Sequence, residues 1–256
     1  ETEGNDRADF NLPANQNKLI EAVLEANQNT IVILNTGSPI HMPWAHKARA
    51  IVQTWFAGQE FGNALVDILS GEVNPSGKLP TTFPAKIEDT PAYQFYPGTD
   101  LQMNYHEKLL VGHRWYEKKS VMPLFYFGHG LSYTNFMYQN LEVSVDKDFV
   151  VSCRFEVQNI GNILGQEIAQ CYVGYSNPLT DEPCKTLQGF MKAEIRPNEV
   201  KNFEIQLGPR NFSYWSVDAN AWQIKGGTYK ILIGSSSKDI YLETTINLEQ
   251  ALEVLQ

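Results

Sequence analysis

The sequence predicts an α/β fold in two parts: part of an open, mainly parallel α/β sandwich lobe, followed by an antiparallel β-sandwich. Up to about residue 90, short continuous apolar runs alternate with segments whose apolar residues recur at helical spacing. Beyond residue 137, apolar residues instead recur with a period of two. The 256 residues, 43% of them hydrophobic, are enough to build two cores.

The first part should begin with a helix that ends by about Asn27, because its apolar residues recur every three or four positions. Residues 30–34 and 50–55 are nearly continuous apolar runs, which is typical of parallel strands covered on both faces. Residues 59–70 read as a second helix, which Gly71 closes in the left-handed conformation. This order of strands and helices predicts a parallel sheet.

The loop at residues 35–39 follows the first predicted strand. Ligands of open α/β sheets collect beyond the carboxyl ends of the strands, so this loop is a candidate pocket wall. The alternative is a turn in which Gly37 and Pro39 only satisfy backbone geometry.

Residues 73–136 are rich in Pro, Gly and aromatic residues and show little periodicity, which indicates an ordered connector. Five later runs alternate, among them residues 141–145, 151–157 and 229–233, with turn signals between them. We therefore predict domains at residues 1–90, 91–136 and 137–256. No cluster of exposed aromatic residues is recognisable in the last of these, which is expected to be a structural support or a distal contributor to substrate contacts.

Composition excludes several classes of function. A net charge of −9 and an isoelectric point near 5.1 argue against a nucleic-acid partner. No apolar run is long enough to predict a membrane span, and no secretory leader is visible. The five histidines lack metal-ligand spacing, so no metal site is expected. No organic cofactor is expected. Cys153, Cys171 and Cys184 are odd in number and widely spaced, and are predicted to be buried free thiols.

Acidic residues gather where the chain opens, without Met, at Glu1, Glu3 and Asp6. Glycosidic bonds are commonly cleaved by two carboxyl groups, and this segment could supply one of them. We therefore expect a site that is completed by polypeptide lying upstream. The alternative is that these acids are solvated loop charges.

Four segments carry a resemblance to a known family: residues 3–7 (EGNDR), 32–39, 55–64 and 71–80. In order and spacing they resemble the C-terminal lobe of glycoside hydrolase family 3 enzymes. Residues 111–116 and 127–136 resemble that family's connector into a fibronectin type III-like domain. The resemblance covers essentially the whole chain. His113 and His129 stand where the family more often has Tyr.

The resemblance implies a preceding (β/α)₈ barrel that carries an aspartate nucleophile, and a glutamate acid/base supplied by this lobe. It maps the acid/base onto Glu3, with Glu1 as the reserve choice. The acid must be protonated near the working pH, which a neighbouring cation would oppose. We therefore expect Arg7 to pair with Asp6 rather than with Glu3.

The implied function is the C-terminal portion of a retaining, exo-acting β-glucosidase that hydrolyses terminal β-D-glucosyl residues and is inactive without its barrel. The expected partners are a β-glucoside or oligosaccharide, the barrel portion and possibly a second copy. A β-xylosidase or related exo-glycosidase, or a non-catalytic carbohydrate-binding or assembly module, stays open, as does the compartment, cytoplasmic or secreted. Candidate sugar-stacking rings are Trp44, Trp55, Phe56, Trp115 and Tyr116.

Overall fold

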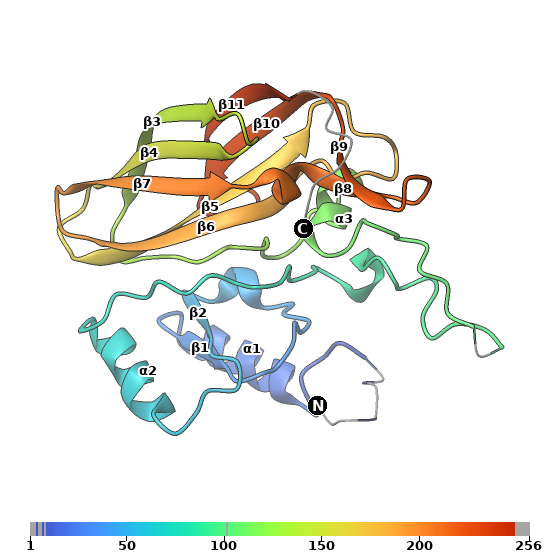
Figure 1. Cartoon of the computed structure of the whole chain (residues 1–256). Coiled ribbons are helices and arrows are strands. Elements are labelled where there is room, and N and C mark those ends of the chain that lie inside the picture. The colour runs from blue at the N-terminus through green and yellow to red at the C-terminus, as the bar shows by residue number, and fades with distance from the viewer. Residues whose placement is uncertain (1–3, 5–6, 8, 101, 249–256) are drawn as a thin grey trace.

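The structure, a computed structural model, describes residues 4, 7, 9–100 and 102–248. Figure 1 shows a β-sandwich stacked on a smaller α/β part, with the connecting segment running along the boundary between them. No helix among the described residues is long and apolar enough to cross a membrane. The predicted fold class, a parallel α/β lobe followed by an antiparallel sandwich, is confirmed. The predicted boundaries at residues 90 and 136 stay predictions.

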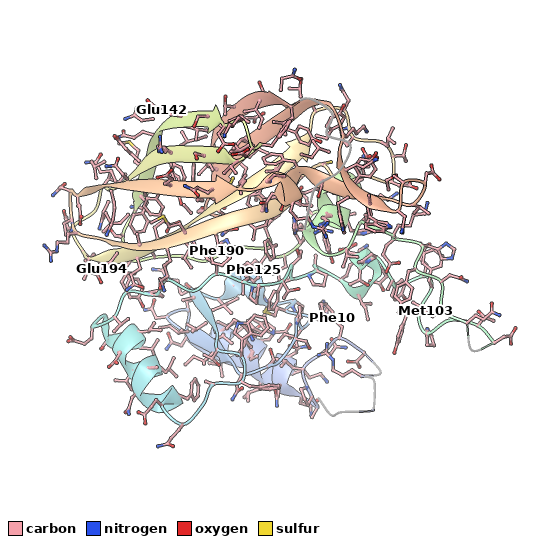
Figure 2. All side chains as sticks on the ribbon, viewed as in Figure 1. Phe10, Met103, Phe125, Glu142, Phe190 and Glu194 are labelled. Atoms are coloured by element: carbon pink, nitrogen blue, oxygen red, sulfur yellow. The ribbon has the colours of Figure 1, made fainter. Side chains whose placement is uncertain are left out.

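The α/β part contains helices α1 (Gln16–Ala26) and α2 (Phe61–Ser70) and the parallel strands β1 (Ile31–Leu34) and β2 (Ala50–Gln53). Leu24 of α1 packs with Val32 and Leu34 of β1 in a core around the fully buried Trp44. Phe125, labelled in Figure 2, returns from the connector to pack against this core. Short 3₁₀ turns occupy Ala45–Lys47 and Ile87–Asp89.

The strands of this part are less covered than the sequence predicts. Only alternate residues of β1 are buried, while Ile31 and Ile33 are 47% and 38% exposed. Helix α2 has no buried residue, and its Val66 is 61% exposed. The prediction that both faces of these strands are buried is therefore wrong for this chain. In the part of the chain that the structure describes, β1 and β2 pair only with each other, and α1 covers one side.

The sandwich consists of two antiparallel sheets. One has the order β3 (Phe136–Val145), β4 (Val151–Asn159) and β7 (Val200–Leu207). The other has the order β11 (Ile240–Leu248), β10 (Gly227–Gly234), β5 (Gly165–Tyr175) and β6 (Thr186–Ile195). A 3₁₀ turn at Pro209–Phe212 leads into a hairpin of β8 (Ser213–Ser216) and β9 (Ala221–Ile224). Alternate residues of both sheets form one core between them.

Strand β5 departs from the alternating pattern because both of its faces are covered. Residues 169–174 are all buried. The connector covers the outer face: the Gln170 amide donates to the Gly128 carbonyl at 3.2 Å, and the Tyr172 ring meets His113 edge-on. His113 opens the short helix α3 (His113–Lys118), which the sequence did not reveal.

Polar contacts, among them a buried ion pair, join the two parts. Lys78 Nζ lies 3.3 Å from Glu167 Oε1 of β5, and both side chains are almost completely buried. The Tyr138 hydroxyl donates to the same oxygen at 2.8 Å. Asn74 Nδ2 donates to the Leu164 carbonyl at 3.0 Å. Because a buried charge needs its partner, these contacts fix the sandwich against the α/β part in one orientation.

Candidate active site

Glu3, the predicted acid/base, lies outside the described residues, as do the reserve residue Glu1 and Asp6. The expected pairing of Arg7 with Asp6 therefore stays a prediction. The described segment that follows is anchored: Arg7 Nη2 donates to the carbonyl of Pro39 at 3.2 Å. This bond joins the segment that carries Glu3 to the loop at residues 35–39.

The next residues of the segment are tied to the chain that continues from this loop. The His41 amide donates to the Phe10 carbonyl at 2.7 Å, and the two rings stack with their centroids 6.1 Å apart. His41 Nδ1 lies 3.0 Å from Asn11 Oδ1. The opening segment thus lies across the chain that leaves the carboxyl end of β1, which is the edge where ligands of parallel sheets bind.

Hydrogen bonds also connect the carboxyl ends of β1 and β2. Gln53 Nε2 donates to the Thr36 carbonyl at 2.8 Å and contacts its hydroxyl at 3.2 Å. Thr54 donates from both its amide and its hydroxyl to the Leu34 carbonyl, at 2.8 and 2.7 Å. Among the described residues, Gln53 Oε1 is buried without a hydrogen-bond partner. The loop is thus tied to the end of β2, and the backbone of Trp55 that follows is left-handed, with φ 55°. Residues 35–39 line neither of the two cavities described below, so their role as a pocket wall stays a prediction.

The five candidate stacking rings divide into core and surface. Trp44 and Tyr116 are buried and belong to the interior, so they are excluded as platforms. Trp55 packs edge-on against Phe83, and the Trp115 indole donates to the Asp89 carbonyl at 3.1 Å. Phe56 is 72% exposed and directly follows β2 and Trp55. It is the candidate that the structure leaves most open to a sugar.

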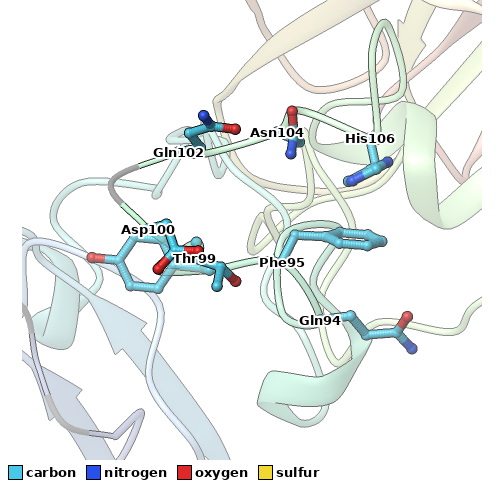
Figure 3. Close-up of a pocket in the computed structure, with 9 residues that line it drawn as sticks. Gln94, Phe95, Thr99, Asp100, Gln102, Asn104 and His106 are labelled. Atoms are coloured by element: carbon cyan, nitrogen blue, oxygen red, sulfur yellow. The ribbon is translucent and has the colours of Figure 1, made fainter.

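Two cavities lie along this side of the molecule. One of about 320 Å³ is lined by residues of the opening segment, Asp9, Phe10 and Asn11, together with His41 and Tyr93. The other, of about 400 Å³, lies wholly within the connector and is lined by polar and aromatic residues between positions 94 and 106 (Figure 3). The sequence treated this stretch only as connector, because no periodic or motif signal marks its lining residues.

The strongest shifts of pKa lie away from this edge, at the boundary between the two parts. Burial, with Arg114 and Lys185 nearby, lowers the pKa of His113 to about 4. Burial raises the pKa of Glu117 and of Glu167, and each is opposed by a lysine, Lys185 for Glu117 and Lys78 for Glu167. Glu117 and Glu167 are held in buried ion pairs, and His113 is buried between the rings of Phe127 and Tyr172, which explains the three shifts without a catalytic role.

Among the residues that the structure describes, no group of three or more His, Cys, Asp or Glu side chains is placed to hold a metal ion. Cys153 and Cys171 are buried free thiols, as predicted, but Cys184 is exposed. The prediction fails for Cys184 because it lies between strands β5 and β6 rather than in one of them. The sandwich also carries an aromatic cluster that the sequence did not reveal, with Trp215 and Trp222 paired across the β8–β9 hairpin.

Sequence comparisons give a consistent family. The profile of the glycosyl hydrolase family 3 C-terminal domain matches residues 1–133, and that of the fibronectin type III-like domain matches residues 167–237. The chain is 41% identical over 257 residues to thermostable β-glucosidase B of Acetivibrio thermocellus, covering 99% of this chain and 34% of the relative. It is 41% identical over 263 residues to β-glucosidase B of Emericella nidulans, covering 97% and 31%.

Solved structures agree with the sequence comparisons. A β-glucosidase of Kluyveromyces marxianus in complex with glucose superposes with a TM-score of 0.92 at 37% identity, over 97% of this chain and 30% of that one. A family 3 β-glucosidase of Bifidobacterium adolescentis superposes with a TM-score of 0.94 at 33% identity, over 100% and 38%. The chain spans about a third of the length of the curated relatives it matches. It belongs to glycoside hydrolase family 3, as that family's C-terminal domain followed by a fibronectin type III-like domain.

Proposed function

We propose that this chain is the C-terminal portion of a retaining, exo-acting β-glucosidase that hydrolyses terminal β-D-glucosyl residues, and that Glu3 is its general acid/base. The observation that carries the proposal is similarity along nearly the whole chain, in sequence and in structure, to proteins named β-glucosidases. The sugar preference comes from those names, and a β-xylosidase would share the same fold and chemistry.

The geometry of the opening segment supports the role of Glu3. The segment is bonded through Arg7 and Phe10 to the chain that leaves the carboxyl end of β1. A carboxyl group four positions before Arg7 would therefore stand on a segment anchored at the ligand-binding edge of the sheet. An anchored segment can hold a proton donor in the narrow range of positions that catalysis requires.

In the proposed mechanism Glu3 acts twice. It first donates its proton to the glycosidic oxygen while a carboxylate from the preceding barrel attacks the anomeric carbon. It then removes a proton from the water that hydrolyses the glycosyl–enzyme bond. This exchange of roles requires the two carboxyl groups to lie about 5–5.5 Å apart. The residues of this chain alone supply only one of them, so the chain by itself should not cleave glycosides.

The α/β part exposes apolar residues that the rest of a longer polypeptide would cover. Ile31 and Ile33 of β1 are exposed, as are Leu19 of α1 and Val66 of α2, at 63% and 61%. Apolar faces of this kind on a parallel sheet are normally covered by further elements of the same fold. The relatives are about three times longer than this chain, which leaves ample polypeptide for that purpose.

The experiment that tests the proposal compares Glu3→Gln with Glu1→Gln in the full-length protein that carries this chain. Without a proton donor, glucosides with poor leaving groups should lose activity far more than those with good ones, by a factor on the order of 10²–10⁴. Glu1→Gln is the matched control and should leave that dependence unchanged. Equal losses for good and poor leaving groups in Glu3→Gln would remove Glu3 from this role, and a parent protein that binds glucosides without cleaving them would indicate a non-catalytic module.

A further inference from the structure

The connector contains a pocket that neither the acid/base chemistry nor the family's motifs account for. It measures about 400 Å³, and its walls come from one loop between residues 94 and 106. Figure 3 shows Gln102, Asn104 and His106 along one strand of the loop, and Gln94, Phe95, Thr99 and Asp100 along the other. A cavity of this size accommodates one or two sugar rings.

The backbone gives the pocket a fixed shape. Thr99 and Gln102 exchange both of their backbone hydrogen bonds, at 3.0 and 2.9 Å, which closes the end of the loop. Gly98 has φ 96°, and a Cβ there would lie 2.2 Å from the Gln102 carbonyl oxygen. The rings of Phe95 and His106 pack with centroids 4.0 Å apart, which joins the two sides near its base.

The lining has the composition of a site for a neutral, polyhydroxylated ligand. It offers three amide side chains, Gln94, Gln102 and Asn104, which can each donate and accept hydrogen bonds. Asp100 adds a carboxylate acceptor, and Phe95 and Tyr96 add aromatic rings. The lining contains no Lys or Arg, so a phosphate or another anion would find no counter-charge there. The hydroxyl groups of a pyranose can form hydrogen bonds with the amide and carboxylate side chains, and its C–H face can pack on the aromatic rings.

The position of the pocket connects it to the proposed catalytic segment. Tyr93, which precedes the first lining residue, lines the neighbouring cavity together with Asp9, Phe10 and Asn11. Those residues belong to the segment that carries Glu3. The two cavities therefore follow one another along the connector, starting beside the segment with the proposed proton donor.

We propose that the pocket between residues 94 and 106 binds a remote sugar unit of an oligosaccharide substrate, on the leaving-group side of the bond that is cleaved. The inference rests on the proposed function, because a proton donor must stand beside the oxygen that links the terminal sugar to the leaving group. An oligosaccharide bound there would extend from the opening segment at residues 9–11 past Tyr93 into the pocket. An aryl glucoside would be too short to reach it.

The test measures kcat/KM of the full-length protein for cellotetraose and for 4-nitrophenyl β-glucoside. Tyr96→Ala and Asn104→Ala should each lower the ratio of kcat/KM for cellotetraose to kcat/KM for 4-nitrophenyl β-glucoside by about fivefold to tenfold, since a lost ring or amide contact is worth roughly 1–1.4 kcal/mol. Tyr105→Ala is the matched control: Tyr105 is 73% exposed on the same loop but does not line the pocket. The ratio should not change in this control.

If the ratio of the two kcat/KM values is unchanged in both pocket variants while the parent cleaves both substrates, the proposed sugar site is contradicted and the proposed function stands.

If the parent cleaves neither substrate, the proposed function fails, and calorimetric titration with cellotetraose still tests whether the pocket binds a sugar. Binding that weakens about tenfold in Tyr96→Ala but not in Tyr105→Ala would support it. Equal binding by the parent and both variants, or no binding, would contradict it. A thermal unfolding curve for each variant identifies any that fails to fold, in which case Asn104→Ala replaces Tyr96→Ala.

Discussion

At the residue scale, the contacts of single side chains separate groups that serve chemistry from groups that serve the fold. Arg7 follows the predicted acid/base by four residues in sequence, and its guanidinium donates to the Pro39 carbonyl. His113 has a strongly lowered pKa, yet it stacks on Phe127 and packs against Tyr172 in the boundary. The lowered pKa of His113 therefore reflects its burial. The candidate site is indicated instead by the hydrogen bond that anchors the opening segment to the loop at residues 35–39.

Arg7→Ala should lower kcat/KM of the full-length protein for an aryl β-glucoside by about tenfold. The reason is the loss of one charged hydrogen bond that orders the segment carrying Glu3. The pH profile of kcat/KM is the measurement, and both of its limbs should keep their positions. A change confined to the acidic limb would instead show that Arg7 acts on the pKa of the proton donor.

His113 should make the free energy of unfolding depend on pH between about 4 and 6.5. Its folded pKa of about 4 lies below the ordinary value of 6.5, so the unfolded chain binds more protons in this window. Stability is therefore complete above pH 6.5 and is lost as the pH falls toward 4, by about 3 kcal/mol at most.

Urea unfolding at pH 7 and at pH 5 measures this dependence. His113→Phe keeps a ring against Phe127 and removes the titration, so the two pH values should differ less in the variant than in the parent. Glu117 and Glu167 are present in both proteins, so their own dependence on pH cancels in the comparison. An undiminished dependence in the variant would exclude His113 as its source.

At the element scale, the sequence predicted the regular elements well and the irregular ones poorly. Helix α2 begins at Phe61 and ends at Ser70, close to the predicted residues 59–70, because its apolar period is strong. Strand β2 stops at Gln53, two residues early, because Thr54 turns back to bond the Leu34 carbonyl. Helix α3 has six residues, too few for a helical period to be recognised.

The candidate site was predictable only in part, for a related reason. The position of the loop after β1 follows from the order of strands and helices, so its place at the ligand-binding edge could be predicted. Contacts between Phe10 and His41, or between Gln53 and Thr36, join residues that have no shared periodicity. The role of Glu3 came from the family resemblance and not from any pattern of spacing.

Replacing the glycines at the two ends of α2 by alanine should change the free energy of unfolding in opposite directions. Gly71 closes the helix with φ 86°, a conformation that costs other residues about 1 kcal/mol, so Gly71→Ala should lower the free energy of unfolding by roughly that amount. Gly62 is the second residue of the helix and has open space around the Cβ position, so Gly62→Ala should raise the free energy of unfolding, by less than the roughly 1 kcal/mol of a helix interior. Urea unfolding measures both, and equal signs would contradict this assignment of backbone strain.

At the scale of the whole molecule, the sandwich supports the connector, and the connector carries the second cavity. Both faces of β5 are covered, one by the sandwich core and the other by residues such as Gly128 and His113. Lys78 and Glu167 join the α/β part to the same strand. These contacts hold the connector and the α/β part against the fibronectin type III-like domain.

The most direct test of the account uses azide with the Glu3→Gln full-length protein and an aryl β-glucoside that has a good leaving group. Such a substrate needs no proton donor to form the glycosyl–enzyme, and azide needs no base to attack it. We predict that azide accelerates the variant at least about tenfold and yields β-glucosyl azide, with no such effect on Glu1→Gln. Absence of acceleration and of the azide product in Glu3→Gln would contradict the claim that this chain supplies the acid/base through Glu3.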